Sequence, residues 1–246
     1  MHTLAECPFR TEASSIRRVP ETTPRLEDTL IRGYRQLAQA TPRRSHDALL
    51  RALDIAFSAL FLLVALPLSL LIAAAILVTS GRPVLYGGER VGRGGRIFEM
   101  YKFRTLRPDA ETRLGPYLGS ELVERTRAEY TPIGRWLKAS QLDEIPQFWN
   151  VLRGDMSLVG PRPIRPIFFE ELAHDLPAYW QRLVVRPGLT GFAQVRRGYE
   201  TSMAEKLAHD LEWIADRSVP LYLRTVAATG WRVLKQSLRG VVRPRE

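Results

Sequence analysis

The sequence predicts an α+β fold that is mostly helical: a re-entrant membrane helix broken at Pro67, then a small cytosolic domain with interfacial amphipathic helices. Three observations predict this fold. The segment from Ile55 to Val78 has no charged residue, basic residues flank it on both sides, and short strand-like and longer helix-like patterns follow it.

Across 246 residues, 36 Lys and Arg exceed 26 Asp and Glu, giving a net charge of +10. This excess indicates a polyanionic partner: nucleic acid, anionic lipid or a phosphorylated substrate.

Residues 1–45 are predicted to be a flexible N-terminal extension, because they mix Pro, Thr, Arg and Glu with few large apolar residues. A short amphipathic helix is the alternative for part of it, since Leu26, Leu30, Tyr34 and Leu37 recur at helical spacing. Cys7 is the only cysteine, which excludes an internal disulfide and a thiolate zinc site and fits a reducing compartment. The first ten residues lack the pattern of a secretory signal peptide.

Residues 46–80 form the predicted membrane segment. A run of roughly 18 or more apolar residues is long enough to span a bilayer, but Pro67 lies near its middle, where it removes a backbone hydrogen bond. Each half is about 18 Å long as a helix, too short for a hydrocarbon layer of about 30 Å. A kinked spanning helix, a re-entrant helix and a buried helix of a soluble protein all remain open on length alone.

Flanking charge favours the re-entrant helix. Basic residues near a membrane segment prefer the cytoplasmic side, and they occur here both before the run (Arg43, Arg44, Arg51) and after it (Arg82, Arg90, Arg93, Arg96). A single span would place one basic flank on the wrong side. A helix that returns to the face it entered satisfies both flanks.

Residues 81–246 form the predicted cytosolic domain. Five glycines between Gly87 and Gly95 indicate tight turns between short strands, without a P-loop or dinucleotide-binding pattern. A polar helix or loop is expected over 109–130, and helical structure over 131–152, with Pro146 in the first turn of a new helix. The basic, Leu- and Val-rich C-terminal segment fits a helix lying in a membrane interface as well as an ordinary surface helix.

The candidate chemistry lies in consecutive acids, Asp143 and Glu144, which would point about 100° apart on a helix. The four histidines show no metal-ligand spacing, so carboxylates among basic residues remain, a combination suited to phosphoryl transfer. An Asp can attack phosphorus, and a neighbouring Glu can help to hold Mg²⁺. An Asp-Glu step is also the usual composition of a helix N-terminus. The basic candidates around the pair are Lys102, Arg104, Arg135, Lys138 and Arg162.

Several longer motifs carry a resemblance to a known family. They are the lead-in Arg51-Ala52-Leu53-Asp54, Pro67 within the apolar run, YKFRTL, LDEIPQFWNVLRGDMSLVGPRP, RPGLTGFAQV and EKLAHDLEWI, which together extend over about residues 50–225. The chain resembles the monotopic phosphoglycosyl transferases, the bacterial sugar transferases that start capsule, exopolysaccharide and O-antigen assembly. The block around Asp143 is the most specific of these motifs.

The resemblance implies that residues 81–246 are a catalytic domain at the cytoplasmic face of a bacterial inner membrane. It implies transfer of a sugar-1-phosphate from a UDP-sugar to polyprenyl phosphate, with Asp143 as nucleophile, Glu144 as a Mg²⁺ ligand, and Lys102, Arg104 and Arg162 around the phosphates. It assigns Arg51, Asp54 and Pro67 to the membrane segment. It leaves a homodimer open. Arg135 is predicted to bind phosphate from its place among the basic residues before the acids.

The chain departs from the family pattern at three places. Leu66 precedes Pro67 where many members have Ser, AQVRRGYETS replaces the common AQVNGR, and Tyr222 stands where an Asp is common. We expect the second to affect substrate choice and the third to affect packing. Two other functions are alternatives. A non-catalytic membrane-surface scaffold should have lost the carboxylates, and for a nucleic-acid binder the sequence has no RRM, KH or helix-turn-helix pattern.

Overall fold

The computed structural model describes residues 46–114, 119–196 and 202–242. Within this part of the chain most residues are helical and two small sheets accompany the helices, so the mostly helical α+β prediction is confirmed. The predicted N-terminal extension, with its alternative helix, lies outside the described residues, as does most of the RRGYETS segment.

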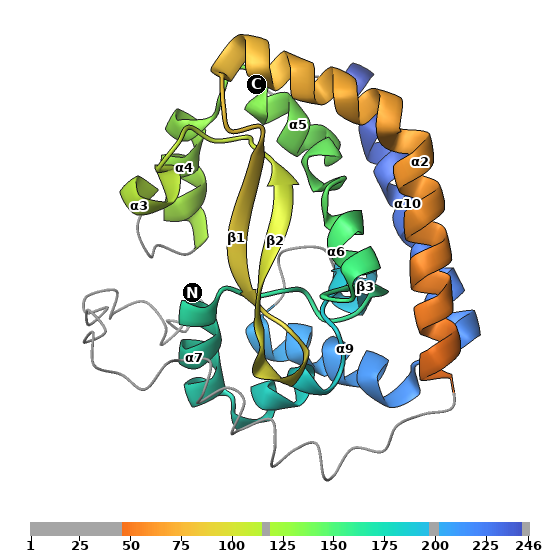
Figure 1. Ribbon diagram of the computed structural model, residues 1–246. Helices are drawn as coiled ribbons and strands as arrows, with labels where there is room; N and C mark the ends of the chain where they lie inside the picture. The colour runs from red at the N-terminus through yellow and green to blue at the C-terminus, as the bar shows by residue number, and fades with distance from the viewer. Residues whose placement is uncertain (1–45, 115–118, 197–201, 243–246) are drawn as a thin grey trace, which may run out of the picture.

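The membrane segment is one 34-residue helix, α2 (Asp47–Ser80), with Pro67 inside it. Figure 1 shows this helix changing direction partway along its length. The structure thus keeps Pro67 within one continuous, bent helix, and the re-entrant arrangement stays a prediction. The physical reason is that a proline removes one backbone donor, which bends a helix without ending it when the turns on either side keep their own bonds.

Helix α2 carries its apolar side chains on the outside of the protein. Only 17% of its most apolar 18-residue window is buried, and among the described residues it is the one helix with the length and composition to cross a membrane. A helix in the core of a soluble protein would be mostly buried, so that alternative is not supported. Large exposed side chains include Leu60, Leu63, Val64, Leu70, Leu71 and Val78.

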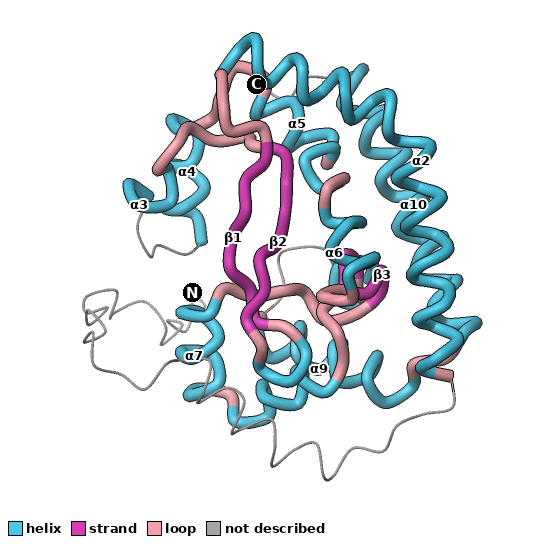
Figure 2. Tube along the Cα trace, in the orientation of Figure 1, coloured by secondary structure: helices cyan, strands magenta, loops and turns pink. Residues whose placement is uncertain are grey.

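A long hairpin follows, as the glycine-rich segment predicted. Strands β1 (Leu85–Val91) and β2 (Ile97–Phe103) pair antiparallel, with Tyr86 opposite Lys102, and the 3₁₀ turn η1 (Arg93–Gly95) joins them. Helices α3 (Ala110–Leu114) and α4 (Gly119–Glu129) form the predicted polar segment. Figure 2 shows the hairpin as the only extended pair of long strands among the described residues.

The predicted helical segment over 131–152 consists of three short pieces. They are α5 (Gly134–Ser140), the 3₁₀ turn η2 (Leu142–Glu144) and α6 (Gln147–Arg153), with Pro146 capping α6. Gln141, at φ 60°, ends α5, and Gly154, at φ 94°, ends α6. Figure 1 shows α5 and α6 lying between the hairpin and α2.

The remaining elements close the domain around this centre. Strands β3 (Ser157–Val159) and β4 (Gly188–Thr190) pair in parallel. The helical pieces are α7 (Pro166–Asp175), η3 (Pro177–Val184), α8 (Phe192–Arg196), α9 (Met203–Asp216) and α10 (Val219–Val242). Helix α10 lies alongside α2, behind it in Figure 1.

An apolar cluster attaches α2 to the segment that carries the candidate site. Ile72 and Ile76 of α2 pack with Phe103, Leu137 and Ile145. These last three residues are neighbours in sequence of Lys102, Lys138 and Glu144, respectively. The membrane helix therefore supports the backbone that carries the charged residues of the site.

Candidate active site

The consecutive acids lie in η2, between the end of α5 and the start of α6. Asp143 is 1% exposed, whereas the side chain of Glu144 is 21% exposed. Local packing explains the difference, because Leu142 and Ile145 turn into the apolar cluster against α2 and carry Asp143 inward with them. As the sequence predicted, the pair comes just before a helix, α6, which Pro146 caps and which begins at Gln147.

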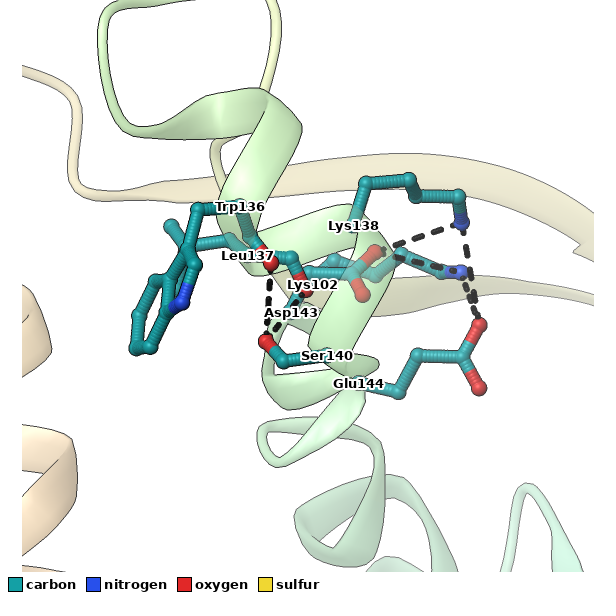
Figure 3. A network of polar contacts seen from close by, with 7 residues as sticks. All are labelled: Lys102, Trp136, Leu137, Lys138, Ser140, Asp143 and Glu144. Carbon is teal, nitrogen blue, oxygen red and sulfur yellow. Dashed lines mark hydrogen bonds and ion pairs between the residues drawn. The ribbon is translucent and has the colours of Figure 1, made fainter. Parts of the chain in front are cut away.

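Two lysines bind the two carboxylates (Figure 3). Lys102 Nζ donates to Glu144 Oε1 at 2.7 Å and lies 4.0 Å from Asp143 Oδ2. Lys138 Nζ lies 3.4 Å from Asp143 Oδ2 and 4.0 Å from Glu144 Oε1. Each lysine thus contacts both acids, and the four charges form one cluster.

A buried asparagine places Lys102 at this cluster. Asn150, on α6, accepts a hydrogen bond from the backbone N–H of Tyr101 and donates to the carbonyl oxygen of Glu99, which fixes β2 against α6. It also donates to Asp155 Oδ2. Because Lys102 follows Tyr101 on β2, these bonds fix the position of Lys102 along the strand relative to η2. Sequence reasoning did not single out Asn150; its only signal was its place within the LDEIPQFWNVLRGD motif.

The structure brings Lys138 to the acids and leaves Arg135 outside the cluster. Lys138 lies on the last turn of α5, one turn beyond the exposed Arg135. Both were basic candidates by sequence, since both precede the pair closely. The turn at Gln141 joins the end of α5 directly to η2, so Lys138, on the last turn of α5, reaches Asp143 and Arg135 does not.

Arg162 lies close enough to act on the cluster through its charge, since it lowers the pKa of Glu144. A buried ion pair holds its backbone: Arg182 Nη2 donates to the carbonyl oxygen of Arg162 at 2.9 Å, while Arg182 Nε donates to Asp210 at 2.8 Å. Arg182 Nη1 also donates to Tyr179 Oη. Asp210 lies within the EKLAHDLEWI motif, but nothing in that motif indicates this supporting role.

Arg104 occupies a different place from the one expected for a phosphate-binding residue. It is 4% exposed, and its terminal nitrogens donate to the carbonyl oxygens of Ser80, Gly81 and Arg82. These carbonyls lie at the end of α2, where the last turn of a helix leaves acceptors unpaired. The structure thus places the Arg104 guanidinium on the end of the membrane helix.

The lead-in residues fasten the start of α2 to the domain. Arg51 donates to the carbonyl oxygens of Val151 and Leu152, at the end of α6. Asp54 is buried, and its Oδ1 accepts hydrogen bonds from Ser157 Oγ, the N–H of Leu158 and Tyr222 Oη. Tyr222, one of the departures from the family pattern, therefore acts in packing, as expected.

The two acids have shifted pKa values of opposite sign. Burial raises the pKa of Asp143, and the charges of Lys138 and Lys102 oppose this shift without cancelling it. Burial would also raise the pKa of Glu144, but Lys102, Arg162 and Lys138 outweigh it and lower that pKa to about 2. Glu144 is therefore ionised at any physiological pH, whereas Asp143 is closer to taking up a proton. Burial lowers the pKa of Lys102 despite its contact with Glu144.

The acids offer oxygen atoms that fit a magnesium ion. Asp143 Oδ1 is buried and has no hydrogen-bond partner among the described residues, and Glu144 next to it is ionised. No group of three or more His, Cys, Asp or Glu that could hold a metal occurs within the described ranges. Mg²⁺ is commonly held by one or two carboxylates together with substrate phosphate oxygens, and this donor set fits that pattern.

Comparison with known proteins identifies the relatives of this chain. Residues 45–236 match the sequence model of the bacterial sugar transferases. The chain is 40% identical over 194 residues to a UDP-glucose:undecaprenyl-phosphate glucose-1-phosphate transferase of Caulobacter vibrioides, covering 75% of this chain and 71% of that protein. It is 34% identical over 197 residues to a UDP-N-acetylgalactosamine-undecaprenyl-phosphate N-acetylgalactosaminephosphotransferase of Aeromonas hydrophila, covering 79% of this chain but 45% of that protein. It is 37% identical over 163 residues to an undecaprenyl-phosphate galactose phosphotransferase of Salmonella typhimurium, covering 62% of this chain and 33% of that protein.

Proposed function

Because the chain belongs to the bacterial sugar transferase family, we propose that it transfers a sugar-1-phosphate from a UDP-sugar to polyprenyl phosphate. The products are UMP and a polyprenyl-diphosphate-sugar, the first membrane-bound intermediate of exopolysaccharide, capsule or O-antigen assembly. The observation that carries the proposal is the buried Asp143, which contacts Lys138 and lies beside an ionised Glu144.

The first step forms a covalent intermediate on Asp143. A carboxylate oxygen attacks the phosphorus that carries the sugar, the bond from that phosphorus to the bridging oxygen breaks, and its electron pair leaves on UMP. In the second step an oxygen of polyprenyl phosphate attacks the same phosphorus. The bond to Asp143 then breaks and the free carboxylate returns. Splitting one transfer into two displacements is the usual gain of nucleophilic catalysis.

The basic residues stabilise negative charge on the transferred phosphate. Lys102, Lys138 and Arg162 surround the acids, and preorganised cations are the main source of stabilisation in phosphoryl transfer. The carboxylate of Glu144 would hold Mg²⁺ together with phosphate oxygens of the substrate, and the bound ion would supply further positive charge to those oxygens. Arg135, exposed on the same helix as Lys138, is proposed to contact substrate phosphate from outside the cluster.

The membrane arrangement is part of the proposal. We infer that α2 enters the cytoplasmic leaflet of the inner membrane, bends, and returns, which keeps the catalytic domain on the side of the nucleotide pool. The bend in α2 and its exposed apolar surface support this arrangement. Trp136 and Trp149 are 57% and 52% exposed, close to the acids in sequence, and exposed tryptophans prefer a membrane–water interface. The acids would then meet the phosphate of a lipid acceptor at headgroup depth.

An assay of UMP release tests the reaction. Purified protein is given polyprenyl phosphate and a panel of UDP-sugars that includes the glucose, galactose and N-acetylgalactosamine donors suggested by the names of its relatives. We expect UMP release with at least one donor and a loss of about 10³-fold or more in Asp143→Asn. Incubation with the donor alone should leave a phosphosugar on Asp143, detectable by mass spectrometry.

Two results would count against the proposal. Full turnover by Asp143→Asn would exclude the covalent route. Failure to release UMP from any donor, by protein shown to be folded, would favour the non-catalytic scaffold instead. The intact cluster of acids and lysines argues for the enzyme, because a scaffold has no need of a buried carboxylate.

A further inference from the structure

A basic pocket, separate from the candidate active site, lies at the N-terminal end of α2. It has a volume of about 60 Å³ and is formed by the first turns of α2, the hairpin turn η1, and the segment leading into β4. Four arginines and two aspartates line it: Arg51, Arg93, Arg186, Arg217, Asp47 and Asp54. The acids of the candidate active site pack instead through Ile145 on the far half of α2, near Ile72 and Ile76. A helix of this length extends about 50 Å, so the pocket is a separate site.

Two of the four arginines are occupied within the protein. Arg217 forms a two-bond ion pair with Asp47, at 2.8 and 3.0 Å. Arg51 donates to the carbonyl oxygens at the end of α6. These two arginines, with Asp54 held by three neutral donors, build the wall of the pocket.

The other two arginines carry unused donors. Arg186 donates from Nε to the carbonyl oxygen of Gly154, and its terminal nitrogens have no hydrogen-bond or ion-pair partner among the described residues. The same part of the structure shows no such partner for the guanidinium of the exposed Arg93. Both residues line the same small pocket, and the charge of Arg93 acts on Arg186. A guanidinium presents a planar fork of donors that matches phosphate oxygens.

Charge within the pocket is unbalanced. Asp47 is already paired with Arg217, which leaves three arginines, Arg51, Arg93 and Arg186, against one remaining aspartate, Asp54. Burial, together with the like charges of Arg51 and Arg93, lowers the pKa of Arg186. An anion bound between them would relieve this repulsion.

We propose that this pocket binds a phosphate group, supplied by the headgroup of an anionic membrane phospholipid. We assign the phosphate to a lipid because of where the pocket lies. It is at the start of the apolar helix, where Leu49, Ile55 and Phe57 are exposed. Acyl chains can lie along these side chains while the phosphate reaches Arg93 and Arg186. The site needs neither the sugar donor nor turnover at Asp143, so it stands apart from the proposed reaction.

Arginine footprinting tests the site directly. The full chain, in neutral detergent, is modified with phenylglyoxal in the presence of phosphatidylglycerol, phosphatidylcholine or inorganic phosphate, and each arginine is quantified by mass spectrometry. We expect phosphatidylglycerol to slow modification of Arg93 and Arg186 by about tenfold, the effect of a charge-assisted hydrogen bond. Arg96, exposed in the same hairpin turn but outside the pocket, should change less than twofold.

Each outcome decides one part of the inference. Equal slowing at Arg93, Arg186 and Arg96 would overturn the site. Protection by inorganic phosphate as strong as that by phosphatidylglycerol would support the phosphate chemistry and overturn the lipid source. Equal protection by phosphatidylcholine would overturn the requirement for an anionic lipid.

A variant pair gives an independent measurement. Arg93→Gln should weaken binding to vesicles of phosphatidylcholine with phosphatidylglycerol by about tenfold. Arg96→Gln, which removes the same charge from the same turn, should weaken it less than twofold. Arg93 is exposed, so its replacement leaves the fold intact. The second variant is Arg186→Lys, which keeps the positive charge but loses the planar fork of donors. Binding by Arg93→Gln equal to that by Arg96→Gln would contradict the proposal.

Discussion

Asp143 and Glu144 are neighbours in sequence with different surroundings. Both contact Lys102 and Lys138, but Asp143 is almost fully buried while Glu144 reaches the surface. Burial therefore decides the pKa of Asp143, and the surrounding cations decide that of Glu144. This contrast fits the two roles proposed for them, a nucleophile and a metal ligand.

The pH profile of the reaction should report Asp143. Only its ionised form can attack phosphorus, so kcat/KM should fall on the acid side with a midpoint above the ordinary Asp value of about 3.9. Glu144, with a pKa of about 2, stays ionised throughout. The lowered pKa of Lys102 predicts a second fall on the alkaline side, below the ordinary Lys value of about 10.4. The measurement is initial UMP release as a function of pH.

A lysine variant identifies the group on the acid side. Lys138→Met removes a charge that opposes the raised pKa of Asp143, so the acid midpoint should move to higher pH. Arg135→Met, on the same helix but outside the cluster, is the control and should leave the midpoint in place. An acid midpoint that did not respond to Lys138→Met would show that another group titrates.

Asp143→Asn should not destabilise the protein at neutral pH. A raised folded-state pKa means that the folded state binds the proton more tightly than the unfolded state, so this stabilisation is present below the unfolded pKa and lost as pH rises through the folded pKa. At neutral pH the ionised Asp143 therefore lowers the free energy of unfolding. We expect the variant to melt at a temperature equal to or above that of the wild type, by fluorescence-monitored unfolding in detergent.

The melting temperatures of the wild type and Asp143→Asn, measured across a range of pH, test this explanation. The advantage of Asp143→Asn should narrow as pH falls through the folded pKa of Asp143, because the wild-type side chain then becomes neutral too. A variant clearly less stable than the wild type at neutral pH would mean that contacts with Lys138 and Lys102 outweigh burial. The inactive variant would then no longer separate chemistry from folding.

At the level of elements, α2 is attached to the domain by polar contacts at both of its ends. Arg51 and Asp54 fasten its start to α6, β3 and α10, and Arg104 caps its end. Between them, an apolar cluster packs α2 against the segment that carries Asp143. A helix with an exposed apolar outer face therefore has a fixed position relative to the acids.

Tyr222→Phe should measure one of these attachments. Tyr222 is fully buried, and its hydroxyl donates to Asp54 Oδ1 at 2.9 Å. Its loss removes one of three donors from a buried carboxylate and should cost about 2 kcal/mol in the free energy of unfolding. Tyr101→Phe is the matched control, because its hydroxyl donates to Glu99 at an exposed position and should cost less than about 0.5 kcal/mol. Equal effects of the two variants would contradict the role assigned to Tyr222.

For the whole molecule, the re-entrant arrangement predicts that both ends of α2 face the cytosol. Single cysteines at His46 and Arg82, introduced with Cys7→Ser, flank the helix on its two sides. A membrane-impermeant maleimide should label both positions in inverted inner-membrane vesicles and neither in intact spheroplasts. Labelling of one position from each side would show a spanning helix and would contradict the arrangement.

Much of the architecture was predictable from the sequence because it depends on local pattern. Glycines flanked by β-branched and aromatic residues indicated the hairpin, and Pro146 marked the start of α6. The apolar run predicted a long exposed helix. Pro67 shows that a backbone hydrogen bond is lost there but not whether the neighbouring turns continue, and the structure keeps the helix continuous through it.

The sequence by itself determined which residues carry the charge, which segment is apolar enough for a membrane, and where the acids lie relative to a helix start. These depend on residue type and on neighbours within a few positions. Only the tertiary structure decided that Lys138 rather than Arg135 meets Asp143, that Arg104 caps α2, and that Asn150 and Asp210 support the site. The contacts of Arg104, Asn150 and Asp210 join residues tens of positions apart, and they depend on how distant segments pack together. Lys138 and Asp143 are five positions apart, but the turn between α5 and η2 decides that they meet, and no local pattern encodes it.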